Sequence, residues 1–222
     1  MNGRHELKHY ISVSDYVQLR SRLRVVAKLD KNARSDGGYK IRSLYFDNYS
    51  DKAVVEKLAG QSRREKFRLR FYNDDISFIR LEKKAKINHL CYKEKSAILA
   101  TECQSLIRGD YDCLNIPDNT LFMELYSKIR YQNLRPTTII DYRREAYVYP
   151  AGNVRVTFDS DIRRSNLVSE FLNPNLVTIP AAKAIILEIK YDGFLPDIIR
   201  DILHIGWRKR TEFSKYLVAR LV

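Results

Sequence analysis

The sequence predicts an α+β fold in which an antiparallel β-barrel forms a tunnel flanked by helices. About seven or eight strand-like segments are interspersed with helical ones. Many neighbouring strands are separated by short turns, which favours antiparallel pairing, and sheets of this size commonly close into barrels. Charged residues recur at every second position on strand after strand, so one whole face of the sheet is expected to be charged.

Length and composition are those of a globular protein with an excess of positive charge. The chain has 222 residues and no repeat, low-complexity segment or linker, so we expect one domain spanning residues 1–222. Lysine and arginine number 40 against 27 aspartates and glutamates, which gives a formal net charge of +13. That excess favours polyanionic partners: nucleic acid, an anionic membrane or phosphate-rich small molecules.

Three features predict a cytoplasmic protein. No run of about 18 apolar residues is present to span a membrane. The first residues, MNGRHELKHY, lack the apolar core of a signal peptide. The three cysteines, Cys91, Cys103 and Cys113, are odd in number and form no CxxC pair, which is typical of reduced thiols rather than of disulfides or a zinc site.

The first elements alternate between strand and helix. Residues 4–10 are predicted to form a strand, and Ser14 is predicted to cap the helix that follows. Residues 39–48 alternate like a strand and stop at an Asp-Asn pair. A short helix then runs from Ser50 to Gly60, because serine favours helix starts and glycine favours helix ends.

Two strands joined by an Asn-Asp-Asp turn are predicted at residues 65–86, which read EKFRLRFYNDDISFIRLEKKAK. Residues two apart in a strand point to the same side, so each strand carries a row of stacked charges. The rows are Lys66, Arg68 and Arg70 on the first strand, and Arg80, Glu82, Lys84 and Lys86 on the second. Such rows have two explanations: the solvated outer face of a sheet, or a binding site in which a large anion lies between the cations.

The remaining segments continue the alternation of strands and helices. We expect a strand at 89–98, helices at 101–109 and 119–132, strands at 136–150, 152–162 and 181–193, and helices at 195–205 and 212–221. Gly109 is expected to end its helix, and Ala151-Gly152 to form the turn between two strands.

Charged rows recur on most of the predicted strands. Solvated faces normally mix both signs of charge, whereas here nearly every strand carries Arg or Lys at its middle. In a closed barrel these faces converge on one interior, a water-filled basic tunnel with a few carboxylates. The rows, besides those of residues 65–86, are Glu6 and Lys8; Lys93 and Lys95; Arg143 and Glu145; Arg155, Thr157 and Asp159; and Glu188 and Lys190. Cations at turns or strand ends are expected on the outer surface: Lys83, Lys86, Arg163, Arg164, Arg208, Lys209 and Arg210.

Several motifs occur in order along nearly the whole chain: RHELKHYIS, SLYFDN, KFRLRFY followed by LEKK, YRREAY, VRVTFDSDI, LEIKYDG and FSKY. Together they resemble the VTC (vacuolar transporter chaperone) domain, the polyphosphate polymerase branch of the CYTH-like triphosphate tunnel metalloenzymes. The resemblance implies an antiparallel tunnel fold that transfers the γ-phosphoryl group of ATP onto a polyphosphate chain with Mn²⁺ or Mg²⁺. The expected ligands are ATP and polyphosphate or triphosphate; a separate membrane partner and the oligomeric state are left open.

The resemblance also implies roles for individual residues. Glu188 matches the metal-binding carboxylate, with Glu6 and Glu82 as further oxygen ligands of the kind that hard divalent cations prefer. Lys215, in FSKY, matches a lysine near the tunnel end and is expected to act in catalysis with Arg68 and Arg70. The expected phosphate-binding cations are Lys8, Arg68, Arg70, Lys84, Lys93, Arg143, Arg155 and Lys190; arginine forks grip phosphate oxygens bidentately.

One departure from the related enzymes bears on the reaction. Relatives that hydrolyse triphosphate begin with a Glu-x-Glu-x-Lys strand, whereas here Arg4 replaces the first glutamate. The change removes a carboxylate that would hold a metal or orient a water, and it favours synthesis or binding over hydrolysis. Three functions stay open: a polyphosphate polymerase, a metal-dependent triphosphatase, and a non-catalytic module that binds polyphosphate, inositol phosphate or RNA. Nucleic acid is not the expected partner, because binding it would require exposed aromatic residues beside the cations, whereas the aromatic residues of the strands mostly lie on the apolar face.

Overall fold

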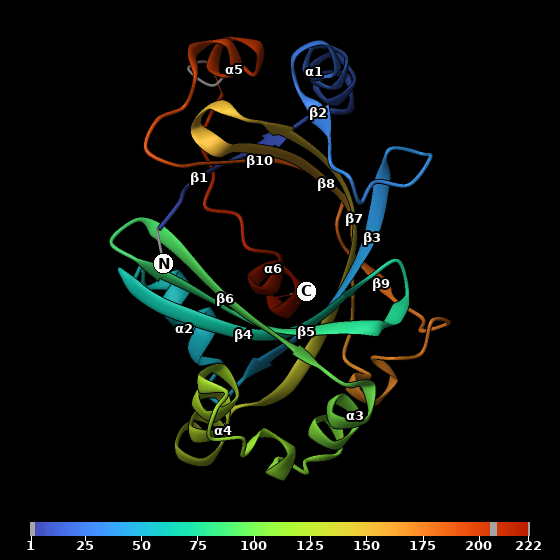
Figure 1. The fold of residues 1–222 in the computed structure, drawn as a ribbon, viewed down its shortest axis with the longest axis vertical. Coiled ribbons are helices and arrows are strands. Elements are labelled where there is room, and N and C mark those ends of the chain that lie inside the picture. Colours follow the sequence, from blue (N-terminus) through green and yellow to red (C-terminus); the bar gives the residue numbers. More distant parts are fainter. Residues whose placement is uncertain (1–2, 205–207, 222) are drawn as a thin grey trace.

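The structure, a computed structural model, describes residues 3–204 and 208–221 and is built around one curved sheet (Figure 1). Its strands are β1 (His5–Ile11), β2 (Lys28–Leu29), β3 (Gly38–Asp47), β4 (Arg63–Tyr72), β5 (Asp75–Ile87), β6 (Leu90–Ile98), β7 (Arg135–Tyr149), β8 (Val154–Ser165), β9 (Ile179–Ala182) and β10 (Ile185–Tyr191). Its helices are α1 (Val13–Val26), α2 (Lys52–Leu58), α3 (Ala100–Arg108), α4 (Thr120–Gln132), α5 (Asp197–Ile202) and α6 (Lys215–Leu221), with short 3₁₀ turns at Asp112–Leu114, Ala151–Asn153 and Val168–Glu170.

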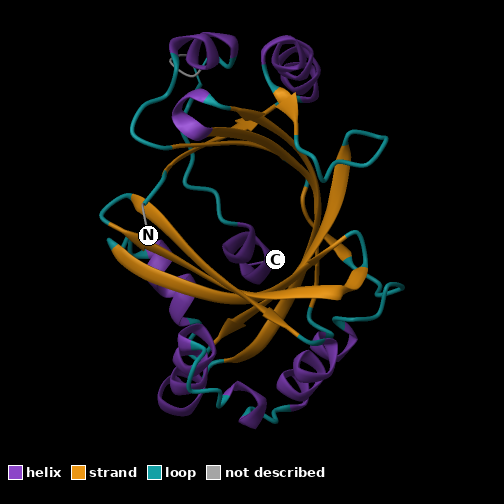
Figure 2. Ribbon diagram, in the orientation of Figure 1, coloured by secondary structure: helices purple, strands orange, loops and turns teal. Residues whose placement is uncertain are grey.

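The strands pair antiparallel in the order β1-β10-β8-β7-β3-β4-β5-β6, with β2 added to β7 and β9 to β8. The two end strands of this path approach each other where Arg4 and Cys91 exchange both backbone hydrogen bonds, each 3.0 Å long. The sheet therefore curves around an enclosed interior, as Figure 2 shows. This architecture confirms the predicted α+β fold with an antiparallel tunnel.

The outer face of the sheet is apolar and is covered by helices. On β4, Phe67, Leu69 and Phe71 point outward into a core shared with α3 and α4. On the opposite side, outward residues such as Phe158 and Leu187 pack in a second core with α1 and α5. Burying such side chains stabilises the fold by about 1.5–3 kcal/mol each. The apolar cores thus lie between the barrel and its helices, which leaves the inner face free to be charged.

A third cluster lies inside the barrel and is formed around α6. Tyr216 and Ala219 of this helix pack against inward residues of the sheet, including Ile140 and Ile186. Tyr216 also donates a 2.8 Å hydrogen bond to Asp47, at the end of β3. Figure 1 shows α6 within the ring of strands. The C-terminal helix therefore fills part of the interior, and the remaining space is the cavity described below.

The local predictions hold for most elements, with corrections at their ends. The cap of α1 is Ser12, in a capping box with Asp15, rather than Ser14. The residue before α2 is Asp51 rather than Ser50. The turn after β4 holds Asn73 and Asp74 at positive φ (54° and 61°), the conformation that a tight hairpin requires.

Two C-terminal predictions need revision. The strand expected at 181–193 is two strands, because β9 pairs with β8 on one side of a break while β10 pairs with both β8 and β1. The helix expected at 195–205 is α5, and Ile205 lies outside the described residues. In the parts of the chain that the structure describes, no helix is long and apolar enough to cross a membrane.

Candidate functional site

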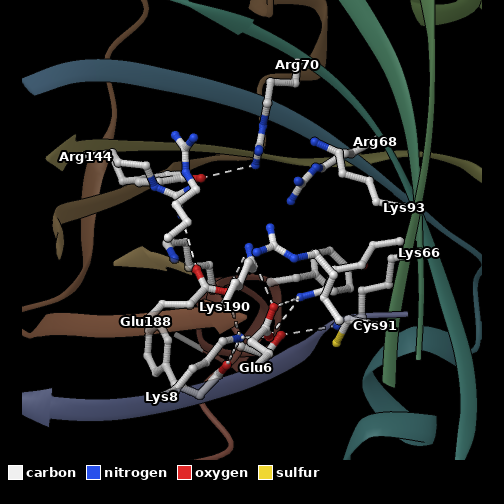
Figure 3. A pocket seen from close by; sticks show the side chains of 18 of the residues that line it. Glu6, Lys8, Lys66, Arg68, Arg70, Cys91, Lys93, Arg144, Glu188 and Lys190 are labelled. Atoms are coloured by element: carbon white, nitrogen blue, oxygen red, sulfur yellow. Dashed lines mark hydrogen bonds and ion pairs between the residues drawn. The ribbon is translucent and has the colours of Figure 1, made fainter. Parts of the chain in front are cut away.

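The interior of the barrel contains a cavity of about 940 Å³ lined mainly by cations. Among the residues that the structure describes, eighteen lysine and arginine side chains line it, against four aspartates and glutamates. Figure 3 shows that the central side chains form two facing groups. We call Lys66, Arg68, Arg70 and Lys93 the cationic wall, and Glu6, Lys8, Glu188 and Lys190 the mixed wall.

The cationic wall is built by the inward rows of β4 and β6. Arg68 donates two hydrogen bonds to Glu82, of 2.9 and 2.8 Å, and a third, of 2.8 Å, to the hydroxyl of Tyr45. The Arg70 guanidinium donates to Ser43 (2.9 Å) and to the hydroxyl of Tyr142 (3.1 Å). Tyr45, Ser43 and Tyr142 are neutral partners, so they fix the two guanidinium groups without cancelling their charge. Glu82 supplies one negative charge against the two guanidinium groups.

Glu82 lies behind this wall rather than in the cavity. Its side chain is fully buried, and its carboxylate contacts Arg68, Arg70 (3.6 Å) and Lys93 (2.5 Å). It does not line the cavity. The metal-binding role expected of Glu82 stays a prediction, and its place outside the cavity sets it apart from Glu6 and Glu188, which line the cavity. Its role is to orient the cationic wall from behind.

The mixed wall comes from β1 and β10, which pair with Lys8 directly opposite Glu188. The Lys8 ammonium lies 3.0 Å from Glu6 and 4.0 Å from Glu188. Lys190 is 3.2 Å from Glu188 and 3.7 Å from Glu6. Two lysines thus bridge the same two carboxylates, and Lys84 of β5 reaches across to Glu6 at 2.8 Å. The two glutamates are neighbours that share their counter-ions.

Asp159 of β8 extends the mixed wall deeper into the barrel. It accepts a bidentate pair of hydrogen bonds from Arg144, of 2.6 and 2.7 Å, and it lies 2.5 Å from the ammonium of Lys215. Arg144 also reaches Glu188 at 3.3 Å. Lys215, the first residue of α6, is thereby tied to the acidic part of the cavity.

Charge and burial together set the protonation of the mixed wall. Burial raises the pKa of Glu6, but Lys8 and Lys84 outweigh that effect and lower the pKa to about 2. For Glu188, burial is likewise outweighed, by Lys190, Lys8 and Arg144, which hold its pKa well below the usual range. Both glutamates are therefore ionised at neutral pH.

On and beside the cationic wall, the pKa values of a lysine and a tyrosine are also lowered. Burial lowers the pKa of Lys66 to about 8, and the charges of Lys8 and Lys84 contribute to the shift. Burial raises the pKa of Tyr45, but Arg68 and Arg70 lower it to about 7. An anion placed between the walls relieves this repulsion.

Most residues expected in the site do line the cavity: Glu6, Lys8, Arg68, Arg70, Lys84, Lys93, Arg155, Glu188, Lys190 and Lys215. Arg155 lies towards one end, where it contacts Asp30 (2.5 Å) and the hydroxyl of Tyr39 (2.8 Å). Lys86 and Arg210, expected on the outer surface, line the cavity instead. For Lys86 the sequence did contain a signal of this position, because Lys86 follows Lys84 on the same face of β5.

Arg143 is the clear exception, because its neighbour Arg144 takes the inward position. Arg143 points outward and donates to Asp36 (2.8 Å), and its side chain is 43% exposed. On this strand Tyr142 and Arg144 line the cavity. Two adjacent arginines occupy opposite faces of a strand, and the sequence-based choice between them was wrong.

No group of three or more His, Cys, Asp or Glu side chains in the described residues is arranged to hold a metal ion. The Glu6–Glu188 pair nevertheless has the donor chemistry that Mg²⁺ and Mn²⁺ prefer, since both groups are ionised oxygen ligands facing the cavity. Mg²⁺ is commonly held by one or two carboxylates, with substrate phosphates and water completing its shell. The pair fits that arrangement.

The structure is thus an antiparallel sheet curled around a basic interior, with acidic residues gathered on one wall. The family model for the VTC domain matches residues 3–222, and the chain belongs to the VTC domain family. A search of curated proteins finds no significant match.

Solved structures are similar in fold at low sequence identity. A Bacillus halodurans protein provisionally assigned as an adenylate cyclase has a TM-score of 0.56 and 14% identity, over 96% of this chain and 95% of that one. This likeness supports the fold. The PH1819 protein of Pyrococcus horikoshii OT3 gives 0.49 and 13%, over 98% of both chains. The Mimivirus capping enzyme triphosphatase gives 0.39 and 9%, over 93% and 89%.

Proposed function

We propose that this protein is a phosphotransferase that moves the γ-phosphoryl group of ATP onto a polyphosphate chain inside the tunnel. One observation carries the proposal: four fixed cations on one wall face two ionised glutamates and their bridging lysines across a single cavity. Triphosphates and polyphosphates carry dense negative charge along a narrow chain. An enclosed row of arginines and lysines suits such a ligand better than it suits a flat or bulky anion.

The residues support the positioning and charge neutralisation on which phosphoryl transfer depends. Arg68 and Arg70 are held by Glu82, Ser43, Tyr45 and Tyr142, so their donors are already oriented before a ligand enters. A divalent metal held by Glu6 and Glu188 would neutralise phosphate oxygens on the opposite side. Lys215 and Arg144, beside Asp159, add positive charge deeper in the cavity.

Arg4 favours synthesis over hydrolysis. Its guanidinium donates to Asp192 (2.7 Å) and to the carbonyl of Asn153, at the rim of the barrel. Because Arg4 stands in place of a glutamate, the first strand contributes Glu6 alone, where a triphosphatase would contribute two glutamates. The mixed wall contains two lysines for its two glutamates, so it carries less net negative charge to orient a water than it would with a second glutamate in place of Arg4.

The second candidate is a metal-dependent triphosphatase of the same fold, which the Glu6–Glu188 pair would also serve. A module that binds polyphosphate without turnover is the third. Incubating the pure protein with ATP, a short polyphosphate primer and either Mn²⁺ or Mg²⁺ separates them. Our proposal predicts ADP and long-chain polymer with little free phosphate. Stoichiometric free phosphate without polymer would establish the hydrolase, and unchanged ATP with bound polyphosphate would establish the binding module.

A further inference from the structure

At one end of the tunnel, three cations surround a single exposed carboxylate. Lys57 of α2, Arg64 of β4 and Lys86 of β5 all contact Glu212: Lys57 forms a close ion pair with it, and the other two lie at 3.4 Å. We call these four residues the mouth cluster. All four line the same cavity as the two walls.

The mouth cluster continues the charged rows of the tunnel outward. Arg64 lies opposite Lys86 in the β4–β5 pairing, and Lys66 lies opposite Lys84 in the next inward-facing pair. Side chains on one face of a strand are about 7 Å apart, so the cations form a continuous track from the cationic wall to the opening. A chain of phosphates that followed the track would reach the mouth cluster after leaving the wall.

Glu212 is the exposed member of the cluster. Its side chain is 61% exposed, whereas those of Lys57 and Arg64 are 11% and 12% exposed. The cations are thus held in place by the protein, while the carboxylate lies at the solvent side of the cluster. Solvent reaches the carboxylate but hardly reaches the Lys57 and Arg64 side chains, so an incoming anion competes with Glu212 for the same three cations.

The residues around Glu212 hold it at the opening. The backbone N–H of Thr211 donates to the carbonyl of Lys8 (2.8 Å), and the Lys8 ammonium donates to the carbonyl of Phe213 (3.0 Å). The Lys66 ammonium donates to the Ser214 hydroxyl (3.2 Å). The segment that carries Glu212 is therefore anchored to both walls of the tunnel, and Lys215 follows directly after it.

We propose that the mouth cluster is an outer subsite for the phosphoanhydride chain and that the Glu212 carboxylate occupies it when no chain is bound. The inference rests on the proposed function, since it assigns a further part of the same tunnel. Phosphate oxygens bind an arginine fork and two lysines more strongly than one exposed carboxylate does. A chain longer than the inner site displaces Glu212, whereas a short anion held between the walls leaves it in place. Glu212 therefore sets the preference of the tunnel for chain length.

The test compares Glu212→Gln with Asp75→Asn. Asp75 lines the same cavity and is exposed, but it begins β5, whereas Lys86 lies near the other end of that 13-residue strand. The two substitutions remove the same charge from the same cavity. Asp75 lies roughly 35 Å along β5 from Lys86, the residue of that strand that Glu212 contacts. Calorimetric titration measures binding of sodium triphosphate and of a long-chain sodium polyphosphate to each variant at fixed low salt.

We expect Glu212→Gln to bind the long chain about fivefold more tightly than the wild type, which is the effect of removing one exposed competing charge. Its affinity for triphosphate, and both affinities of Asp75→Asn, should change by less than about twofold. Lys86→Gln should weaken long-chain binding more than triphosphate binding.

Equal effects of the Glu212 and Asp75 substitutions would overturn the inference, because net charge alone would then explain them. So would a Glu212→Gln variant that bound the long chain more weakly. If the wild type bound neither anion, the proposed function would fail and this inference with it; if it bound both and the variants matched, the subsite alone would be refuted.

Discussion

The ammonium of Lys215 and the carboxylate of Asp159 lie 2.5 Å apart inside the barrel, and they join α6 to the inner face of β8. Asp159 is completely buried and is also held by Arg144. The pair places a cation from the C-terminal helix against the acidic part of the tunnel. The helix is thus part of the site and not only a plug for the barrel.

Lys215→Ala should slow phosphoryl transfer about tenfold to a hundredfold, because it removes a positive charge fixed next to the substrate cavity. It should cost about 2 kcal/mol of unfolding free energy, since Asp159 keeps its two hydrogen bonds from Arg144. Lys215→Arg keeps the charge and serves as the control. Steady-state rates with ATP, set beside urea unfolding curves, check both effects. A fully active alanine variant would exclude Lys215 from the reaction.

Arg143 and Arg144 provide a matched test of which residues of β7 face the tunnel. Arg144→Gln leaves Asp159 and Glu188 without their shared guanidinium, and we expect it to destabilise the protein by about 3 kcal/mol. Arg143→Gln changes an exposed pair with Asp36 and should stay within about 0.5 kcal/mol of the wild type. Triphosphate affinity should fall for the first variant alone. The reverse ranking in urea unfolding would contradict the assignment of inward and outward faces.

The charged rows could be predicted from the sequence because they depend on local geometry. Side chains alternate along a strand, so Lys66, Arg68 and Arg70 had to share a face wherever the strand lay. The inner face of β4 and the outward Phe67, Leu69 and Phe71 confirm that reasoning. The phase was ambiguous only where charges fill adjacent positions, as at Arg143 and Arg144. There, tertiary contacts accompany the choice: Arg143 binds Asp36 on the outer face, and Glu145, two residues on, binds Tyr16 and Arg20 of α1.

Long-range placement was beyond the reach of the sequence pattern. Nothing in the period of residues 212–221 shows that the helix lies inside the barrel rather than on its surface. Lys86 and Arg210 were assigned to the surface because they end their segments, yet the curvature of the sheet brings them to the tunnel. The burial of Glu82 behind the arginines likewise depends on how β5 sits between β4 and β6.

Glu188→Gln should keep the fold and triphosphate binding but lower turnover by at least about a hundredfold, because the proposed metal loses an ionised ligand. Glu145→Gln is the matched control: Glu145 is equally buried, but it lies on the outer face, where it binds Arg20 and Tyr16. That substitution should reduce stability and spare turnover. Equal activity of the Glu188 variant and the wild type would refute its role as a metal ligand.

Binding of triphosphate at pH 8 should be accompanied by proton uptake. Burial lowers the pKa of Lys66 to about 8, so this lysine is only partly charged in the empty protein at that pH. A bound anion favours the ammonium form and raises the pKa, so the protein takes up protons, and affinity falls as pH rises through about 8. Titrations in buffers of different ionisation enthalpy measure the uptake. It should shrink in Lys66→Gln; an undiminished uptake would assign the proton to another group.

The most direct test of the tunnel is a crystal structure of the protein with triphosphate and Mn²⁺, using the anomalous scattering of manganese to locate the ion. We predict triphosphate density between the cationic wall and the mixed wall, with phosphate oxygens at Arg68 and Arg70. The manganese peak should lie beside Glu6 and Glu188. Triphosphate bound only on the outer surface, or manganese away from both glutamates in crystals that contain triphosphate in the tunnel, would contradict the account.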